Sequence, residues 1–243
     1  MKKESAMPSD TTTTVQEVQQ ADAQAALQDY ALPAAFPALN GPLGFYPVVP
    51  DAQWVERLLQ WGVRTVQLRF KSPAQDATAI AEQVQAAVQA GRAVAGAQVF
   101  INDHWQQAIA AGAYGVHLGQ EDWAALSAAE RHALQTSGLR LGLSTHTPEE
   151  LALAKAAQPS YLAIGPVYPT TLKVMPYEPV GLERLRLWAQ SAAPYPVVAI
   201  GGISLERMQA VLACGVQGVA VVSAVTLADD PQAAVRQALV LSA

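Results

Sequence analysis

The chain has 243 residues, of which 51% are hydrophobic and 14% are charged, and its formal net charge is -5. This length suits one α/β barrel of ~250 residues, although length alone also allows two smaller domains. The composition excludes a disordered chain, and the acidic balance excludes an extended basic surface for nucleic acid.

The start of the chain and its one cysteine bear on location. Met1, Lys2 and Lys3 are not followed by an apolar run, and no apolar stretch approaches the ~20 residues that span a bilayer. Cys214 lies among small apolar residues, which predicts a buried structural thiol. We therefore predict a cytoplasmic protein with small-molecule partners and with neither nucleic acid nor membrane as a partner. A homo-oligomer is compatible with the sequence, which does not fix the oligomeric state.

Residues 1–40 differ in composition from the rest of the chain. Residues 11–14 are all threonine, and Gln and Ala then dominate as far as Leu27. We predict a flexible N-terminal extension with one short helix around residues 15–27 and no catalytic role. The alternative is a helix that docks over the bottom of the catalytic domain, which we place at residues 41–243.

From Gly44 onward, short apolar runs alternate with Ala- and Leu-rich amphipathic stretches. Eight such strand–helix units predict a parallel sheet closed into a single-domain (β/α)8 TIM barrel. A doubly wound open sheet is disfavoured because no Gly-rich turn follows the first strand. The strands are predicted to begin near Phe45, Thr65, Gln98, Gly115, Leu139, Tyr161, Pro196 and Gly218, and the helices to cover residues 53–61, 76–92, 105–111, 123–135, 148–157, 181–191, 205–213 and 231–241.

The second predicted strand carries polar side chains at every other position. Gln67, Arg69 and Lys71 share one face, whereas the residues between them are apolar. Buried cations need partners, and no carboxylate alternates with them in this strand. A ladder of structural salt bridges is the alternative. The pattern favours an anion-binding stripe that rises to the barrel mouth.

Two aspartates follow the next two strands directly. Asp103 comes after the third strand and Asp122 shortly after the fourth, beside the basic stripe. Magnesium is usually held by one or two carboxylates and by substrate phosphates. We therefore predict that Asp103 and Asp122 bind Mg²⁺, with Glu121 as a substitute ligand. The alternative is that each aspartate only caps the following helix.

The fifth strand ends in Ser144 and His146. A hydrolase triad is disfavoured because no G-x-S-x-G turn surrounds the serine. We interpret Ser144 as a ligand hydroxyl, and His117 and His146 as supporting histidines rather than bases.

The last three strands predict a second anion site. The long loop after the sixth strand offers Thr170 and Lys173, and the ends of the seventh and eighth strands offer Gly202, Val222 and Ser223. Barrels often bind phosphate there through backbone N–H groups. Two anion sites in one mouth indicate a transferase that expels diphosphate.

Seven segments, one per strand from the second onward, together closely resemble the thiamine phosphate synthase family. The resemblance begins at about Gly44 and runs to the end of the chain. It implies a thiamine-biosynthesis transferase that joins 4-amino-2-methyl-5-pyrimidinylmethyl diphosphate to thiazole phosphate and releases pyrophosphate. The segments are residues 67–71 (QLRFK), 101–103 (IND), 115–122 (GVHLGQED), 142–146 (GLSTH), 165–170 (GPVYPT), 199–203 (AIGGI) and 221–224 (VVSA).

The resemblance also implies residue roles and a dissociative mechanism, in which diphosphate leaves before the thiazole nitrogen captures a pyrimidine carbocation. Mg²⁺ would bind at Asp103 and Asp122, and the catalytic cations would be Arg69, Lys71 and Lys173. The pyrimidine diphosphate would contact Gln67, Arg69, Lys71, Asn102, Ser144 and Lys173, and the thiazole phosphate would contact Thr170, Gly202, Val222 and Ser223.

Three alternatives stay open at this point. A thiazole tautomerase of the same superfamily would not need the metal–diphosphate residues. A phosphosugar isomerase or aldolase would need a base or Schiff-base lysine, for which Lys71 is the candidate. A catalytically weakened barrel would bind its ligands without turnover.

One position departs from the family pattern. The family usually reads Pro-Thr-x-Thr-Lys in the loop after the sixth strand, and here Leu172 replaces the second Thr. We expect weaker thiazole phosphate binding than in a Leu172→Thr variant, because one hydroxyl contact is missing unless Thr171 compensates. Steady-state kinetics with thiazole phosphate as the varied substrate checks this, and an unchanged KM would contradict it.

Overall fold

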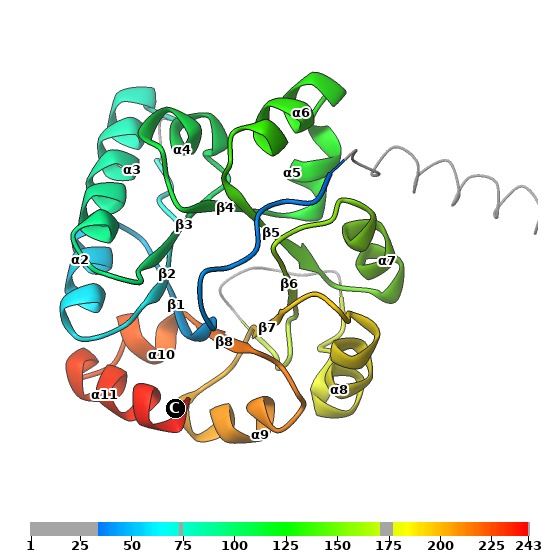
Figure 1. The fold of residues 1–243 in the computed structure, drawn as a ribbon. Helices are drawn as coiled ribbons and strands as arrows, with labels where there is room; N and C mark the ends of the chain where they lie inside the picture. The colour runs from blue at the N-terminus through cyan, green and yellow to red at the C-terminus, as the bar shows by residue number, and fades with distance from the viewer. Residues whose placement is uncertain (1–33, 73–74, 171–176, 243) are drawn as a thin grey trace, which may run out of the picture.

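Eight parallel strands form a closed barrel in sequence order, and β1 pairs with β8 to complete it (Figure 1). The computed structural model describes residues 34–72, 75–170 and 177–242. The predicted (β/α)8 architecture is confirmed. The strands are β1 Gly44–Val49, β2 Thr65–Leu68, β3 Gln98–Asn102, β4 Gly115–Leu118, β5 Arg140–Thr145, β6 Tyr161–Ile164, β7 Val197–Ile200 and β8 Gly218–Val221.

The helices surround the barrel as a ring (Figure 1). No helix of the described residues is both long and apolar enough to cross a membrane. The helices are α2 Ala52–Gln60, α3 Ala77–Arg92, α4 Trp105–Ala111, α5 Gln120–Ala125, α6 Ala128–Thr136, α7 Pro148–Ala156, α8 Gly181–Ser191, the 3₁₀ turn η1 Leu205–Arg207, α9 Met208–Leu212, α10 Ser223–Thr226 and α11 Pro231–Leu241.

Two predicted helices differ from the structure. The single helix expected over 123–135 is divided into α5 and α6, because Ser127 begins a new helix. Its side chain accepts from the Glu130 N–H, and the Glu130 carboxylate accepts from the Ser127 N–H. A reciprocal capping box of this kind stabilises the first turn of a helix and marks its N-terminus. The helix expected over 205–213 begins with η1, and α10 was not predicted.

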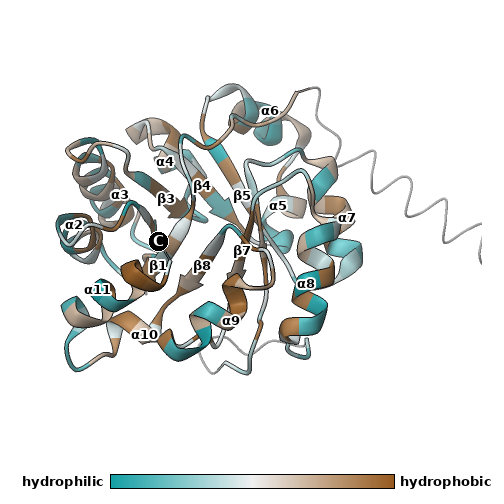
Figure 2. Ribbon diagram, turned by 60° about the horizontal axis from the view of Figure 1, so that its bottom comes forward, coloured by the Kyte–Doolittle hydropathy of each residue, from teal (hydrophilic) through white to brown (hydrophobic). Residues whose placement is uncertain are grey.

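Apolar residues fill the space between the strands and the helices, and a second group fills the barrel interior. Figure 2 shows the apolar strands at the centre and polar residues on the outer helices. Cys214 is 3% exposed within the outer layer, as predicted for a structural thiol. The interior group contains three aromatic rings among smaller apolar side chains. Its members are Leu43, Tyr46, Val48, Phe100, Tyr161, Ala163, Val198 and Ala220.

Residues 34–43 cross the bottom of the barrel, the end where the strands begin (blue in Figure 1). The Phe36 N–H donates to the Gln158 carbonyl at 3.0 Å, and the Phe36 ring meets Trp123 edge-on at 6.2 Å between centroids. Arg140 donates to the Ala38 carbonyl and to the Asn40 side chain. The part of the predicted leader that the structure describes therefore packs on the barrel, whereas the helix predicted at 15–27 lies outside the described residues.

We predict that Phe36→Ala lowers the free energy of unfolding by about 3 kcal/mol, because it removes a ring that is 5% exposed. Urea denaturation measures this change. The control is Leu187→Ala on α8, where the side chain is 58% exposed and the expected loss is under about 0.5 kcal/mol. Equal effects of the two substitutions would show that the crossing segment does not anchor the fold.

Candidate active site at the barrel mouth

The polar stripe of β2 runs from the barrel interior to the mouth, the end where the strands finish. Gln67 is 4% exposed and donates to the Tyr46 hydroxyl inside the barrel at 3.2 Å. Arg69 follows the strand and is half-buried, and Lys71 is exposed beyond it. The stripe thus presents its cations progressively toward solvent.

Asp103 lies close enough to this stripe and to Asp122 to interact with both. Asp103 directly follows β3 with a left-handed backbone, φ 62°, and Asp122 lies in the first turn of α5. Surrounding protein raises the pKa of the Asp103 carboxyl, and repulsion by Asp122 adds to this, whereas Arg69 and Lys71 oppose it. Four residues from three separate predicted segments therefore come together around the Asp103 carboxyl.

The two aspartates do not occupy the capping positions of the following helices. The cap of α4 is His104, and the cap of α5 is Gly119. Both aspartates are exposed residues, although enough protein surrounds the Asp103 carboxyl to raise its pKa. The helix-cap alternative considered from the sequence therefore does not account for either carboxylate.

This donor set fits a hard divalent cation that keeps part of its coordination for other ligands. Across the described ranges, no three His, Cys, Asp or Glu side chains gather into an all-protein metal cage. Two mutually repelling carboxylates remain, and a cation between them would relieve the repulsion that raises the pKa of Asp103. Magnesium commonly binds to one or two carboxylates, with water and substrate phosphates completing its shell.

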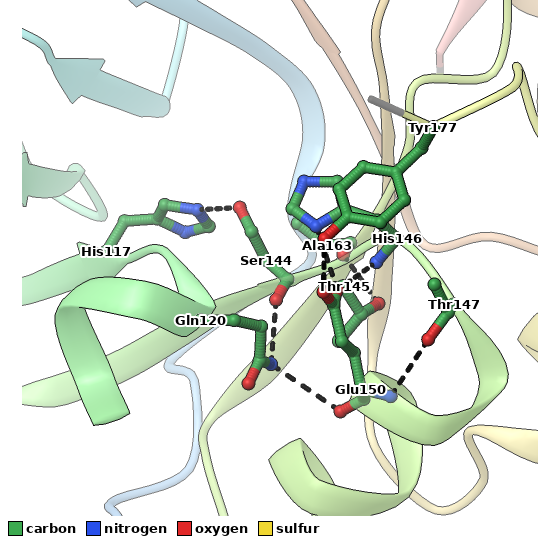
Figure 3. Close-up of polar contacts among 9 residues, drawn as sticks. All are labelled: His117, Gln120, Ser144, Thr145, His146, Thr147, Glu150, Ala163 and Tyr177. Atoms are coloured by element: carbon green, nitrogen blue, oxygen red, sulfur yellow. Dashed lines mark hydrogen bonds and ion pairs between the residues drawn. The ribbon is translucent and has the colours of Figure 1, made fainter. Parts of the chain in front are cut away.

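Ser144 is held by His117, not by His146. Its hydroxyl lies 2.8 Å from His117 Nε2 (Figure 3). On the other side of the ring, His117 Nδ1 lies 2.7 Å from the Tyr161 hydroxyl. Burial lowers the pKa of His117 to about 4, and the positive charge of Arg69 adds to this. The imidazole is thus neutral near pH 7, and the partner of its other nitrogen is a buried phenol instead of a carboxylate. A Ser-His-Asp triad is absent from this group.

A second group joins the end of β5 to the loop after β6. Glu150 accepts from the His146 backbone N–H at 2.7 Å and from the Tyr177 hydroxyl at 3.0 Å. The His146 and Tyr177 rings stack with centroids 4.9 Å apart, and Gln120 donates to the Ser144 carbonyl at 2.9 Å (Figure 3). These contacts hold Tyr177, the first described residue after the gap at 171–176, over the end of β5.

The ends of β7 and β8 form the glycine-rich part of the mouth. Gly201 and Gly202 have left-handed φ values of 99° and 64°. A Cβ on Gly202 would lie 2.5 Å from the Pro169 carbonyl oxygen, so only glycine fits this approach to the loop after β6. Val222 caps α10, and Ser223 begins it.

The remaining predicted residues divide between the mouth and the undescribed loop. Asn102 ends β3 and is 8% exposed, and Thr170 is the last described residue before the gap. Thr171, Leu172 and Lys173 lie outside the described residues. The expectations for Leu172 and Lys173 therefore stay predictions.

Sequence comparison matches residues 46–225 to the family model described as thiamine monophosphate synthase. The chain belongs to this family. The match spans the barrel from β1 to α10 and includes each described site residue above. The resemblance drawn from the motifs is confirmed, and with it the prediction of an enzyme.

Individual relatives agree with the family model. The chain is 52% identical to the thiamine-phosphate synthase of Yersinia pestis (strain Pestoides F) over 204 residues, covering 84% of this chain and 92% of that protein. It is 50% identical to the Photorhabdus laumondii enzyme of the same name over 208 residues, 86% of this chain and 94% of that one.

Solved structures show the same architecture. The thiamine phosphate pyrophosphorylase from Pyrococcus furiosus is 31% identical, with a TM-score of 0.69 over 82% of this chain and 95% of that one. A 3-hexulose-6-phosphate synthase is 17% identical with a TM-score of 0.57 over 82% of this chain and 99% of that one, and it shares the fold alone.

For this family member we predict that Asp122→Asn lowers the pKa of Asp103, because it removes the carboxylate that repels it. The surrounding protein still raises the pKa, so only the part of the shift that comes from repulsion is lost. Arg69→Met has the opposite effect, since a cation that favours the ionised carboxyl is lost. Carbon-detected NMR titration of ¹³C-labelled aspartate measures both shifts without metal. If neither substitution changed the pKa of Asp103, then Asp103, Asp122 and Arg69 would not form one interacting site.

Proposed function

We propose that this protein is a thiamine phosphate synthase that condenses 4-amino-2-methyl-5-pyrimidinylmethyl diphosphate with thiazole phosphate. The observation that carries the proposal is the electrostatic convergence of Arg69, Lys71, Asp103 and Asp122 at one barrel mouth. A diphosphate needs such a mixture, with cations for its oxygens and carboxylates for the accompanying metal. Membership of the family supports the transferase reaction in thiamine biosynthesis.

Asp103 and Asp122 would hold Mg²⁺. When bound, the ion would supply positive charge to the diphosphate leaving group. Arg69 offers a planar fork of N–H donors from its half-buried position, and Lys71 offers a point charge at the exposed end of the stripe. Lys173 would add a third cation from the loop after β6. These cations act on the charge that develops as the leaving group departs.

The reaction breaks the bond between the pyrimidine methylene carbon and the diphosphate oxygen, whose electron pair leaves with the diphosphate. The thiazole nitrogen then donates its electron pair to that carbon and forms the new C–N bond. No protein nucleophile is required, which suits a serine that is engaged by a neutral His117. Gln67, Asn102 and Ser144 would orient the pyrimidine, so alignment of two substrates supplies much of the rate.

The thiazole phosphate would bind on the opposite side of the mouth, at the ends of β7 and β8. Gly202 packs closely against the loop after β6, and Val222 and Ser223, where α10 begins, would offer backbone N–H groups. Thr170 would add a hydroxyl from the neighbouring loop. Barrel enzymes frequently bind phosphate at these two strand ends.

The alternatives are less well supported. A tautomerase acting on thiazole phosphate has no use for a paired-carboxylate and paired-cation site, and a Schiff-base aldolase leaves Arg69, Asp103 and Asp122 without a role. A weakened barrel that only binds its ligands would keep the same residues, and only a measurement of turnover distinguishes it from the synthase. We also propose a cytoplasmic location, which a single buried thiol supports, and a homo-oligomer stays a prediction.

The proposal predicts that the protein releases pyrophosphate only when both substrates and Mg²⁺ are present. Asp103→Asn or Asp122→Asn should lower kcat by roughly 10²–10³-fold, the usual loss when one transition-state charge contact is removed. A coupled assay for pyrophosphate, with each component omitted in turn, measures this.

The matched control is Glu82→Gln, which removes an exposed carboxylate on α3 and should leave the rate unchanged. Binding of both substrates without release of pyrophosphate would favour the weakened binding barrel. Release from one substrate alone would indicate a hydrolase.

A further inference from the structure

Five polar side chains form a continuous hydrogen-bonded chain across the barrel interior. Gln67 Nε2 lies 3.2 Å from the Tyr46 hydroxyl, which lies 2.8 Å from the Tyr161 hydroxyl. The Tyr161 hydroxyl lies 2.7 Å from His117 Nδ1, and His117 Nε2 lies 2.8 Å from Ser144 Oγ. Each residue comes from a different strand, in the order β2, β1, β6, β4 and β5. The chain therefore connects two proposed ligand contacts through residues with no assigned role.

The packing of β5 makes room for the centre of this chain. A Cβ on Gly142 would lie 2.2 Å from the Tyr161 ring carbon that bears the hydroxyl and 2.4 Å from the hydroxyl oxygen. The Tyr161 ring meets Phe100 edge-on at 5.1 Å and stacks on His117 at 5.6 Å. The Tyr161 hydroxyl is thus held in one position, since Tyr161 is fully buried.

The direction of the hydrogen bonds follows from the chemistry at each end. The Gln67 amide nitrogen can only donate, so the Tyr46 oxygen accepts and its proton must point elsewhere. Burial raises the pKa of both phenols, so each carries its proton. Tyr46 then donates to Tyr161, and Tyr161 donates to His117 Nδ1. A neutral imidazole that accepts at Nδ1 carries its proton on Nε2.

The reverse order would strand a proton. If Tyr161 donated to Tyr46, the Tyr46 oxygen would accept twice, and within the described part of the chain no further acceptor is recorded for its own proton. An unpaired buried donor is costly, whereas the forward order gives every buried member a partner and leaves only the Ser144 O–H, at the mouth, for a ligand. The chain therefore has one favoured direction.

We propose that this chain is a proton-ordering relay that fixes His117 as the Nε2–H tautomer, so that Ser144 keeps its own hydroxyl proton as a donor for a ligand at the mouth. The Ser144 oxygen accepts a hydrogen bond from His117 Nε2–H, which leaves the Ser144 O–H free to point outward. Tyr46, Tyr161 and His117 act here as positioning residues. Only the identity of the ligand, the pyrimidine diphosphate, rests on the proposed function.

Nitrogen NMR of ¹⁵N-histidine-labelled protein without ligand tests the tautomer directly. The chain has four histidines, and replacing the other three with glutamine assigns the signals of His117. We expect at least about tenfold more Nε2–H than Nδ1–H form, the ratio set by one unsatisfied buried donor. The tautomer ratio is then read in the protein that keeps all four histidines. A predominant Nδ1–H form of His117 there, or comparable amounts of the two forms, would overturn the relay.

Tyr161→Phe tests the mechanism of the bias, because it removes the donor to His117 Nδ1 and keeps the ring. We expect the tautomer ratio to fall by about tenfold toward a mixture, with the fold intact by circular dichroism. Tyr195→Phe is the matched control, since its hydroxyl donates to the Lys155 carbonyl of α7, away from this chain of side chains. An unchanged ratio in Tyr161→Phe would show that the phenol does not set the tautomer.

The same samples separate this inference from the proposed function. If pyrophosphate release fails but the Nε2–H form dominates, the relay stands and the reaction assignment falls. If release occurs and the Nδ1–H form dominates, the enzyme stands and the relay falls. With both intact, Tyr161→Phe and Ser144→Ala should raise the KM for pyrimidine diphosphate and leave that for thiazole phosphate unchanged. If only one of the two variants raised the KM for pyrimidine diphosphate, or if either raised the KM for thiazole phosphate, the link from Tyr161 to Ser144 would be overturned.

Discussion

Closure of the parallel sheet is the constraint on which the rest of the structure depends. Once β1 pairs with β8, all eight strands must end at the same rim, and residues that are distant in sequence meet there. Arg69, Asp103 and Asp122 each follow a separate strand or begin the helix after it, yet Arg69 and Asp122 both act on the pKa of Asp103. The fold thus gathers cations and carboxylates at one rim. A polyanionic ligand can be held there although the net charge of the protein is negative.

The barrel interior meets a second constraint, because polar groups placed there must be satisfied by one another. Most small barrels fill this space with branched aliphatic side chains. Here Tyr46, Tyr161 and His117 replace part of that filling, and every recorded bond passes from one strand to another. Such a network fills the core and also fixes the orientation of its side chains, because each hydrogen bond needs a donor that points at an acceptor. The cost of burying polar atoms then becomes a means of orienting the groups at the mouth.

Much of the fold could be predicted because the alternation of apolar runs with amphipathic stretches depends on local periodicity. Strand and helix positions agree to within a few residues, and the failures have local causes. The capping box at Ser127 divides a continuous amphipathic pattern, and α10 has only four residues, too few to produce a period.

Part of the candidate site could likewise be predicted from local patterns, and part could not. Period-two alternation placed Gln67 inside and Arg69 at the mouth, and strand ends indicated Asp103 and Asp122. Tyr46 and Tyr161 gave no signal, because an aromatic residue in a short apolar strand is usually plain core. Their role depends on hydroxyl contacts across 115 residues of sequence, which no local pattern encodes.

The position of Asp122 shows how the two ends of the barrel depend on each other. It lies on α5, which has six residues and is too short to be stable through helix propensity alone. The next residue, Trp123, is fully buried, and its ring meets Phe36 of the segment that crosses the bottom. Arg131 also lies over that ring at 5.4 Å, from the helix that the Ser127 capping box begins. The carboxylate at the mouth is therefore placed by tertiary packing around one indole, and residues far from the chemistry contribute to its geometry. The break between α5 and α6, which interrupts the predicted helix, is part of what positions this site.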